Sequence, residues 1–177
     1  MVSSIAIAGM ICTLLLSLLS PFILLILLAR KRKGIISAWL LGMLGFFIPQ
    51  LVIRIPALQL LAGLDGFQAF TKAYPLLYII ILALTAGLFE TAGRLAVLRL
   101  GLKRRLSFGV SLAAGAGHGA IESIALIGLT YVNNLAMSLM INAGLLDKLL
   151  PDTAMAETVK QALTGTEPSL FFAAGLE

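Results

Sequence analysis

The sequence predicts an all-α fold, a polytopic transmembrane helix bundle of about four spans plus the start of a fifth. Of its 177 residues, 60% are hydrophobic and 12% are charged, against roughly 45–50% and about 25% in soluble domains. Its long uncharged runs exceed the ~20 apolar residues that cross a bilayer. The chain is long enough for four or five such spans with their loops, so these observations argue against a soluble single domain.

The first predicted span covers residues 5–29, which are uncharged and rich in Leu and Ile. It stops at the basic cluster of residues 30–33, Arg-Lys-Arg-Lys. Because a cleaved signal peptide has its charge before a shorter apolar core, we expect a retained anchor. Basic loops stay in the cytoplasm, which places the N-terminus outside. The second span, residues 35–53, then returns outward as the other half of a hairpin.

Residues 54–72, with Asp65 between two glycines, are typical of an external or interfacial segment. Pro75 is expected to open a third span over 75–98, and a second basic cluster follows at 99–105. The two clusters hold eight of the thirteen Lys and Arg residues. The net charge of +5 is therefore mainly a topology signal. No stripe of basic and aromatic residues indicates a nucleic-acid partner.

The fourth span is predicted over 107–131, and residues 142–168 are expected to form an external segment with a short helix that starts near Pro151. From Ser169 the chain is apolar again, which indicates the start of a fifth helix. We therefore expect residues 1–177 to be one transmembrane domain and the N-terminal part of a longer protein. The expected location is the plasma membrane of a bacterium, with the lipid bilayer as its surroundings.

Four ionisable residues lie within the predicted spans, Glu90 and Arg94 in the third and His118 and Glu122 in the fourth. Each costs at least ~2.5–3.5 kcal/mol to insert, so such residues are functional hypotheses by default. Both pairs have the i, i+4 spacing that puts two side chains on one helix face. At ~1.5 Å per residue, Glu90 and His118 lie roughly 14 and 16 Å from the cytoplasmic ends of two antiparallel helices. The sequence therefore predicts a shared site.

A run of small residues, Ala113–Ala120, surrounds His118. Within it, Gly115 and Gly119 have the small-xxx-small spacing that predicts close helix packing. The alternative is that these two glycines leave room for a substrate backbone beside His118.

The residue types in the predicted site favour hydrolysis of an amide. Glu90 could take a proton from water, with Arg94 moderating its charge. His118 could hold that water or donate to the oxyanion, and Glu122 is expected to fix the orientation and tautomer of the imidazole. The expected substrate is a membrane protein or a lipid-associated peptide, because the site lies within the spans.

Two segments carry a family resemblance, Phe89–Arg94 (Phe-Glu-Thr-Ala-Gly-Arg) and Gly117–Glu122 (Gly-His-Gly-Ala-Ile-Glu). They resemble the paired motifs of the YhfC family of intramembrane peptidases, which is grouped with the glutamic-type clan of CAAX prenyl proteases and PrsW-like proteins. The resemblance implies that Glu90 activates water, that Arg94 and His118 are the motif arginine and histidine, and that Glu122 is the second motif's acid. The wider clan often has adjacent glutamates in the first motif and a third His- or Asn-bearing motif, and this chain has neither a second glutamate beside Glu90 nor a second histidine.

The predicted function is an intramembrane peptidase that uses a glutamate-activated water and no cofactor. Three alternatives are open. An intramembrane metallopeptidase could bind a divalent metal such as zinc through His118, Glu122 and Glu90, although the sequence has no HExxH motif and its single Cys12 cannot form a cysteine cluster. A proton-coupled transporter could relay protons through the same three side chains. A non-catalytic membrane scaffold could use them to lock helices together.

Overall fold

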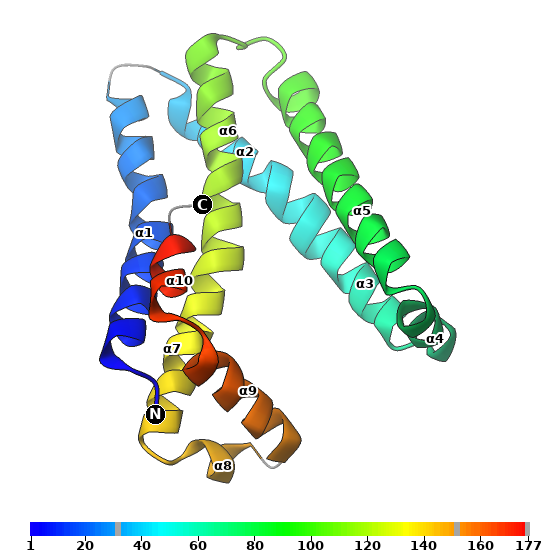
Figure 1. Ribbon diagram of the computed structural model, residues 1–177. Coiled ribbons are helices and arrows are strands. Elements are labelled where there is room, and N and C mark those ends of the chain that lie inside the picture. The colour runs from blue at the N-terminus through cyan, green and yellow to red at the C-terminus, as the bar shows by residue number, and fades with distance from the viewer. Residues whose placement is uncertain (31–32, 151–152, 176–177) are drawn as a thin grey trace. The chain divides into compact units, whose positions relative to one another are not determined.

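The structure, a computed structural model, describes residues 1–30, 33–150 and 153–175. These residues form helices joined by short turns, and they contain no strand (Figure 1). The all-α fold class is therefore confirmed. Part of the first basic cluster, residues 31–32, and the predicted helix start at 151–152 lie outside the described residues.

Four of the described helical stretches are long and apolar enough to cross a membrane. This confirms the prediction of a multi-pass integral membrane protein, whereas the orientation of its N-terminus stays a prediction. The four stretches are Ser4–Ala29, Ile35–Ala62, Pro75–Gly101 and Phe108–Asn142.

The chain forms two compact units, which are described separately. One joins Met1–Phe22 to Ser123–Glu177, and the other is Ile23–Glu122. All four predicted site residues belong to the second unit. The assignment of residues 1–177 to one transmembrane domain stays a prediction.

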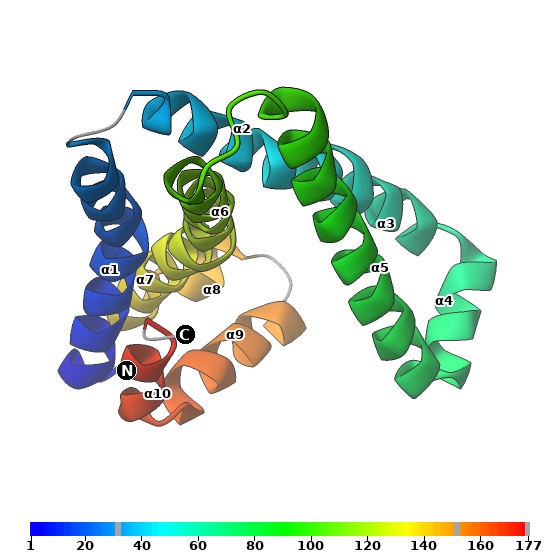
Figure 2. The same ribbon diagram turned by 90° about the horizontal axis from the view of Figure 1, so that it is seen from above.

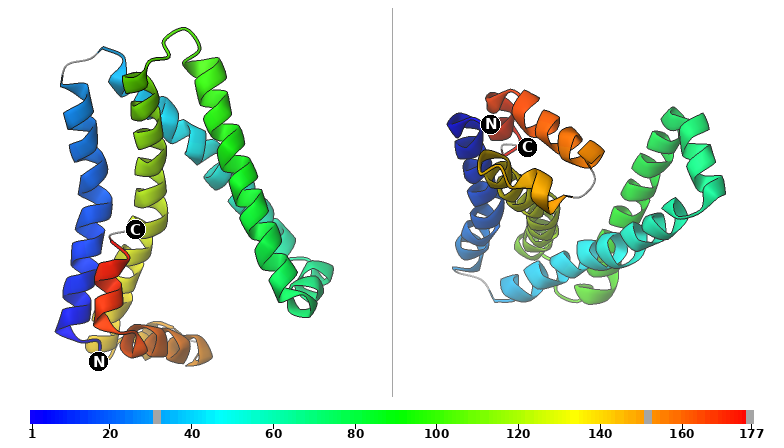
Figure 3. Two further views of the ribbon diagram at one scale, coloured as in Figure 1. Left: turned by 45° about the horizontal axis from the view of Figure 1, so that its top comes forward. Right: turned by 90° about the horizontal axis from the view of Figure 1, so that it is seen from below.

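The first unit packs the N-terminal part of α1 (Ser4–Ala29) against the C-terminal helices. Its core includes Met10, Tyr131, Leu163 and Phe171. The short helix α10 lies beside α1 (Figure 3), and the Thr13 hydroxyl donates to the Phe171 carbonyl. The other helical segments of this unit are η3 (Ser123–Gly128), α7 (Leu129–Asn142), α8 (Leu146–Leu149), α9 (Thr153–Gly165) and α10 (Pro168–Ala173).

One ion pair, between Lys160 and Asp147, connects α8 and α9 in the segment predicted to be external, and a second, between Lys160 and Glu157, lies within α9. Lys160 Nζ lies 2.7 Å from Asp147 Oδ1 and 2.8 Å from Glu157 Oε1. These hydrogen bonds, the one to Asp147 first, raise the pKa of Lys160 above its ordinary value. Exposed pairs of this kind contribute little to stability, so α9 depends mainly on its buried Ala156 and Leu163.

The second unit contains a helical rod longer than the predicted span of residues 35–53. It consists of α2 (Ile35–Phe46), the π-helical segment η1 (Phe47–Arg54) and α3 (Ile55–Ala62). A proline normally ends or kinks an α-helix, but at Pro49 the chain widens into the π-helical turns instead. Arg54, which the sequence interpretation placed at the outer end of the span, therefore lies inside the helix.

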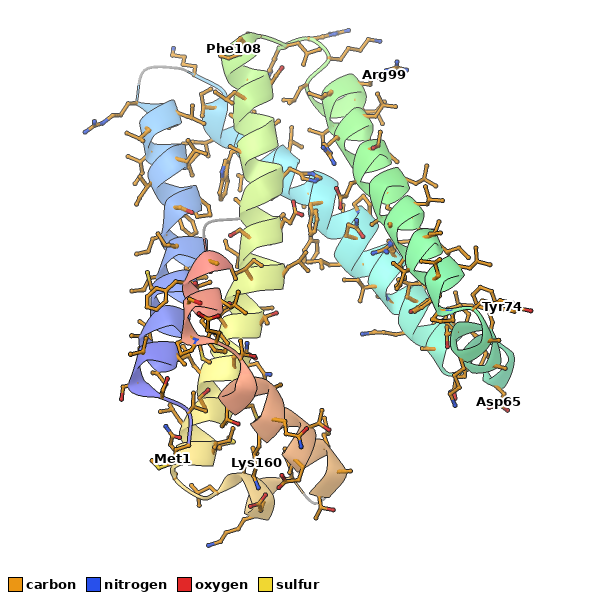
Figure 4. The ribbon with its side chains drawn as sticks, viewed as in Figure 1. Met1, Asp65, Tyr74, Arg99, Phe108 and Lys160 are labelled. Carbon is orange, nitrogen blue, oxygen red and sulfur yellow. The ribbon has the colours of Figure 1, made fainter. Side chains whose placement is uncertain are left out.

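The rod is joined to a second long helix by α4 (Asp65–Ala73), as Figure 2 shows. That helix consists of α5 (Pro75–Ala96), which starts at Pro75 as predicted, and the π-helical segment η2 (Val97–Gly101). Figure 4 places Asp65 and Tyr74 at one end of this helix and Arg99 at the other. The basic cluster and the α4 turn thus lie at opposite ends of one candidate span.

A short connection leads from η2 to α6 (Phe108–Glu122), which packs along α2. The helix α2 and the segment η1 also contact α5. The rod is therefore the common partner of the two helices that carry the predicted motifs. The cluster between α2 and α6 is built on Ile35, Ala38, Leu102, Val110 and Ala113.

Candidate active site

Each sequence motif contains one glycine that brings its helix against the rod. A Cβ added at Gly93 would overlap the backbone carbonyl of Gly45, and a Cβ at Gly117 would overlap that of Trp39. Only glycine allows so close an approach of two backbones. The residues that follow these glycines are Arg94 and His118, so the packing contacts adjoin the candidate catalytic side chains directly.

The expectation that Gly115 and Gly119 pack the fourth span is wrong for the described residues. A Cβ at either glycine would meet none of their atoms within 4 Å. The same run contains a second small-xxx-small pair, Ala113 and Gly117, and this is the pair that faces α2. Two pairs of small residues in this run have the same four-residue spacing, so the spacing alone could not show which pair faces α2.

Glu90 and Arg94 form an ion pair on one face of α5, as their spacing predicts. Arg94 Nη2 lies 2.8 Å from Glu90 Oε2. The Glu90 side chain is 23% exposed and that of Arg94 53% exposed. The carboxylate is therefore the more enclosed partner.

The other oxygen of the Glu90 carboxylate is held by Gln50, a residue that the sequence interpretation missed. Gln50 is 4% exposed, and its Nε2 donates to Glu90 Oε1 at 3.1 Å and to the Ala86 carbonyl at 3.2 Å. Arg54 Nη1 in turn donates to Gln50 Oε1 at 3.2 Å. The available signal was the i, i+4 spacing of Gln50 and Arg54, but the predicted span ended at residue 53, so Arg54 fell in the external segment and Gln50 was given no role.

Arg54 also fastens η1 to α5. Its Nη2 donates to the Leu82 carbonyl at 2.6 Å and its Nε donates to Thr85 Oγ1 at 3.2 Å. A partly buried polar network of this kind, centred on the buried Gln50, is stable only if its members are paired. The two arginines and Gln50 thus hold the Glu90 carboxylate in one position.

His118 is buried, at 6% exposed, and its ring meets Phe46 edge to face at a centroid distance of 5.2 Å. Neither ring nitrogen has a hydrogen-bond partner among the described residues. The expected hydrogen bond with Glu122 is therefore absent, because the imidazole packs against α2 rather than along its own helix. A buried imidazole without partners is costly, which marks it as a candidate for contact with a ligand.

A cavity joins the two motifs. It has a volume of about 110 Å³ and lies among α2, the end of α5, η2 and α6. Both Arg94 and His118 line it, and Glu90 is held beside it by its ion pair with Arg94. The structure thus brings Glu90, Arg94 and His118 into one neighbourhood, and Glu122 lies one helical turn beyond His118 on α6. The lining residues are Gly42, Arg94, Val97, Leu98, Ser111, Ala114, Gly115 and His118.

The alternative metal ligands are not assembled in the described part of the chain. It contains no group of three His, Cys, Asp or Glu side chains that could hold a metal ion, whereas catalytic zinc usually takes three protein ligands. The unpaired His118 fits one ligand position. The set of His118, Glu122 and Glu90 therefore does not fit a complete metal site.

Comparison with known proteins agrees with the two motifs and the membrane fold. Residues 16–177 match the family described as YhfC intramembrane metalloprotease. The chain belongs to this YhfC family. The membrane protein YhfC of Bacillus subtilis is 29% identical to it over 170 residues, which cover 96% of this chain and 64% of that protein. The chain thus spans less than two thirds of this YhfC relative, and no solved structure matches it.

Replacing Gln50 by Leu should lower the rate of any reaction that depends on Glu90 by about 10- to 100-fold, because a small displacement of a reacting group has effects of this size. The substitution leaves Glu90 Oε1 and Arg54 Nη1 without a partner, at about 1–3 kcal/mol for each unsatisfied group. Thermal unfolding in detergent should report this loss. Gln68→Leu is the control, since Gln68 makes a single exposed hydrogen bond to the Ala62 carbonyl. Equal behaviour of the two variants would contradict a positioning role for Gln50.

Proposed function

We propose that this member of the YhfC family is an intramembrane peptidase in which Glu90 activates the attacking water. The observation that carries the proposal is the fixed Glu90 carboxylate, held by Arg94 and Gln50 beside a cavity that Arg94 and His118 line. A general base must be positioned before it can act efficiently, and this arrangement provides that position.

In the proposed reaction, the water oxygen attacks the carbonyl carbon of a peptide bond as Glu90 takes one of the water protons. The negative charge that develops on the carbonyl oxygen is stabilised by a donor in the cavity, and an N–H of the His118 ring is the candidate. Glu90 then gives its proton to the amine nitrogen as the carbon–nitrogen bond breaks. The products are a carboxylic acid and an amine.

In the proposed site, Glu122 acts through its charge and not through a hydrogen bond to His118. It is half-buried at the end of α6, one helical turn beyond His118. The substrate class follows from the location of the site. Because Glu90 and His118 lie within candidate membrane spans, we propose that the substrate is a membrane protein or a lipid-associated peptide.

A metal-dependent variant of the reaction is the second candidate, supported by the family description and by the two unpaired nitrogens of His118. A bound metal ion would polarise the carbonyl or the water. The described residues do not complete a set of ligands, so we derive no step from a metal and propose the glutamate mechanism.

The proposal is tested with purified protein in proteoliposomes that contain a mixture of membrane-spanning peptides. Mass spectrometry should detect new peptide termini with the wild-type protein and none with Glu90→Gln. Proton flux under an imposed gradient, without any new termini, would instead favour the transporter alternative.

Metal removal separates the two peptidase mechanisms. We expect the number and rate of new termini to be unchanged after dialysis against a strong chelator, because Glu90 acts without a metal in the proposed reaction. The metal content of wild-type protein and His118→Gln is measured in parallel. Loss of cleavage on chelation, restored by zinc and accompanied by a lower metal content in His118→Gln, would replace the glutamate mechanism by the metal-dependent one.

A further inference from the structure

The cavity beside His118 is lined by both apolar and polar residues. Most of its lining is apolar or small, with one hydroxyl from Ser111, while Arg94 and His118 supply its charged and polar groups. Gly115 contributes an open stretch of wall, since a Cβ there would meet no described atom within 4 Å. The cavity therefore has an aliphatic part next to the polar groups of the proposed reaction.

A second observation points to a ligand at this place. His118 lines the cavity with 6% of its surface exposed, and both of its ring nitrogens are buried without a hydrogen-bond partner in the described part of the chain. Buried polar groups are nearly always paired with protein or with a bound molecule. The unpaired imidazole thus indicates that a polar group of a bound molecule meets His118 while the remainder occupies the apolar part.

We propose that this cavity binds an aliphatic side chain next to the scissile bond of a peptide substrate, with Gly115 and Leu98 setting the size that it accepts. This inference rests on the proposed peptidase function. A cavity of about 150 Å³ lined by apolar side chains binds benzene, so the smaller volume of about 110 Å³ should favour a side chain such as Val or Leu over the larger side chain of Phe. The backbone amide beside that side chain would then lie against His118.

The proposal is tested first by binding, independently of cleavage. His118 is the only histidine of the sequence, and its ring signals in isotope-labelled intact protein are identified by their loss in His118→Gln. We expect N-acetyl-leucinamide to shift these signals, and N-acetyl-phenylalaninamide to require at least a tenfold higher concentration. Absence of any shift with leucinamide in the wild-type protein would overturn the proposal.

Variants of the wall distinguish the cavity from general binding to the protein or its detergent. Gly115→Leu fills the cavity and should weaken the leucinamide response at least tenfold. Gly119→Leu is the matched control, because Gly119 is equally open but does not line the cavity, and its response should equal that of the wild type. Leu98→Ala enlarges the cavity, so this variant should bind phenylalaninamide. A misfolded protein would lose binding rather than gain it. An equal leucinamide response in Gly115→Leu and Gly119→Leu would overturn the proposal.

Cleavage sites in the peptide mixture provide the second readout. Wild-type sites should have Ala, Val or Leu beside the cleaved bond, and Gly115→Leu should shift them toward Gly and Ala. If leucinamide binds but no peptide is cleaved, the cavity is established and the peptidase function fails. If peptides are cleaved at the same sites by Gly115→Leu, the peptidase function stands and the assignment of the cavity fails.

Discussion

Replacing Glu90 by Gln should lower the rate of peptide cleavage by about 10²- to 10⁴-fold, the range that general-base catalysis contributes. The amide has nearly the shape of the carboxylate and its oxygen can still accept the hydrogen bond from Gln50, but it cannot take a proton from water. The position of the group is thus kept while its chemistry is removed. The measurement is the rate at which new peptide termini form in proteoliposomes.

Two measurements show that such a loss is chemical. Glu157→Gln makes the same change on α9, where the Glu157 side chain is 61% exposed and pairs with Lys160, and it should leave the cleavage rate unchanged. Thermal unfolding of Glu90→Gln should differ little from the wild type, because the amide oxygen keeps the hydrogen bond from Gln50 and the lost charge partner, Arg94, is 53% exposed, where ion pairs contribute about 0–1 kcal/mol. A Glu90→Gln protein that cleaves at the wild-type rate would rule out Glu90 as the base.

Local features of the site follow from the sequence alone. Glu90 and Arg94 share a helix face because the i, i+4 spacing is a property of a single helix, and the ion pair confirms it. The start of α5 at Pro75 also depends on a single position, because proline is favoured in the first turn of a helix. The membrane spans could be predicted because the length and hydropathy of a single segment are enough to identify a candidate span.

The features that depend on a second helix could not be predicted in the same way. Gln50 meets Glu90 across forty positions of sequence, and nothing in either helix alone indicates the pairing. The π-helical turns at Pro49 let the rod continue where a proline normally ends a helix. Likewise, the orientation of His118 depends on Phe46 of α2, so the expected hydrogen bond with Glu122 was not formed.

Gly117→Ala should destabilise the protein and also lower its cleavage rate. The added Cβ would overlap the Trp39 carbonyl, so α6 must move away from α2. Overpacking of this kind costs about 1–3 kcal/mol. His118 is the next residue, and a displacement of about 1 Å at a reacting group can lower a rate about 10²-fold.

Gly115→Ala is the matched control on the same helix, two residues away. Its Cβ meets no described atom within 4 Å, so the substitution should stabilise the helix by about 0.5–1 kcal/mol through the higher helix propensity of Ala. Both variants gain that propensity, and the difference between their unfolding free energies in mixed micelles therefore isolates the contact with Trp39. Equal stability of the two variants would mean that α6 does not approach α2 at Gly117, and the cavity that depends on that approach would have to be reassigned.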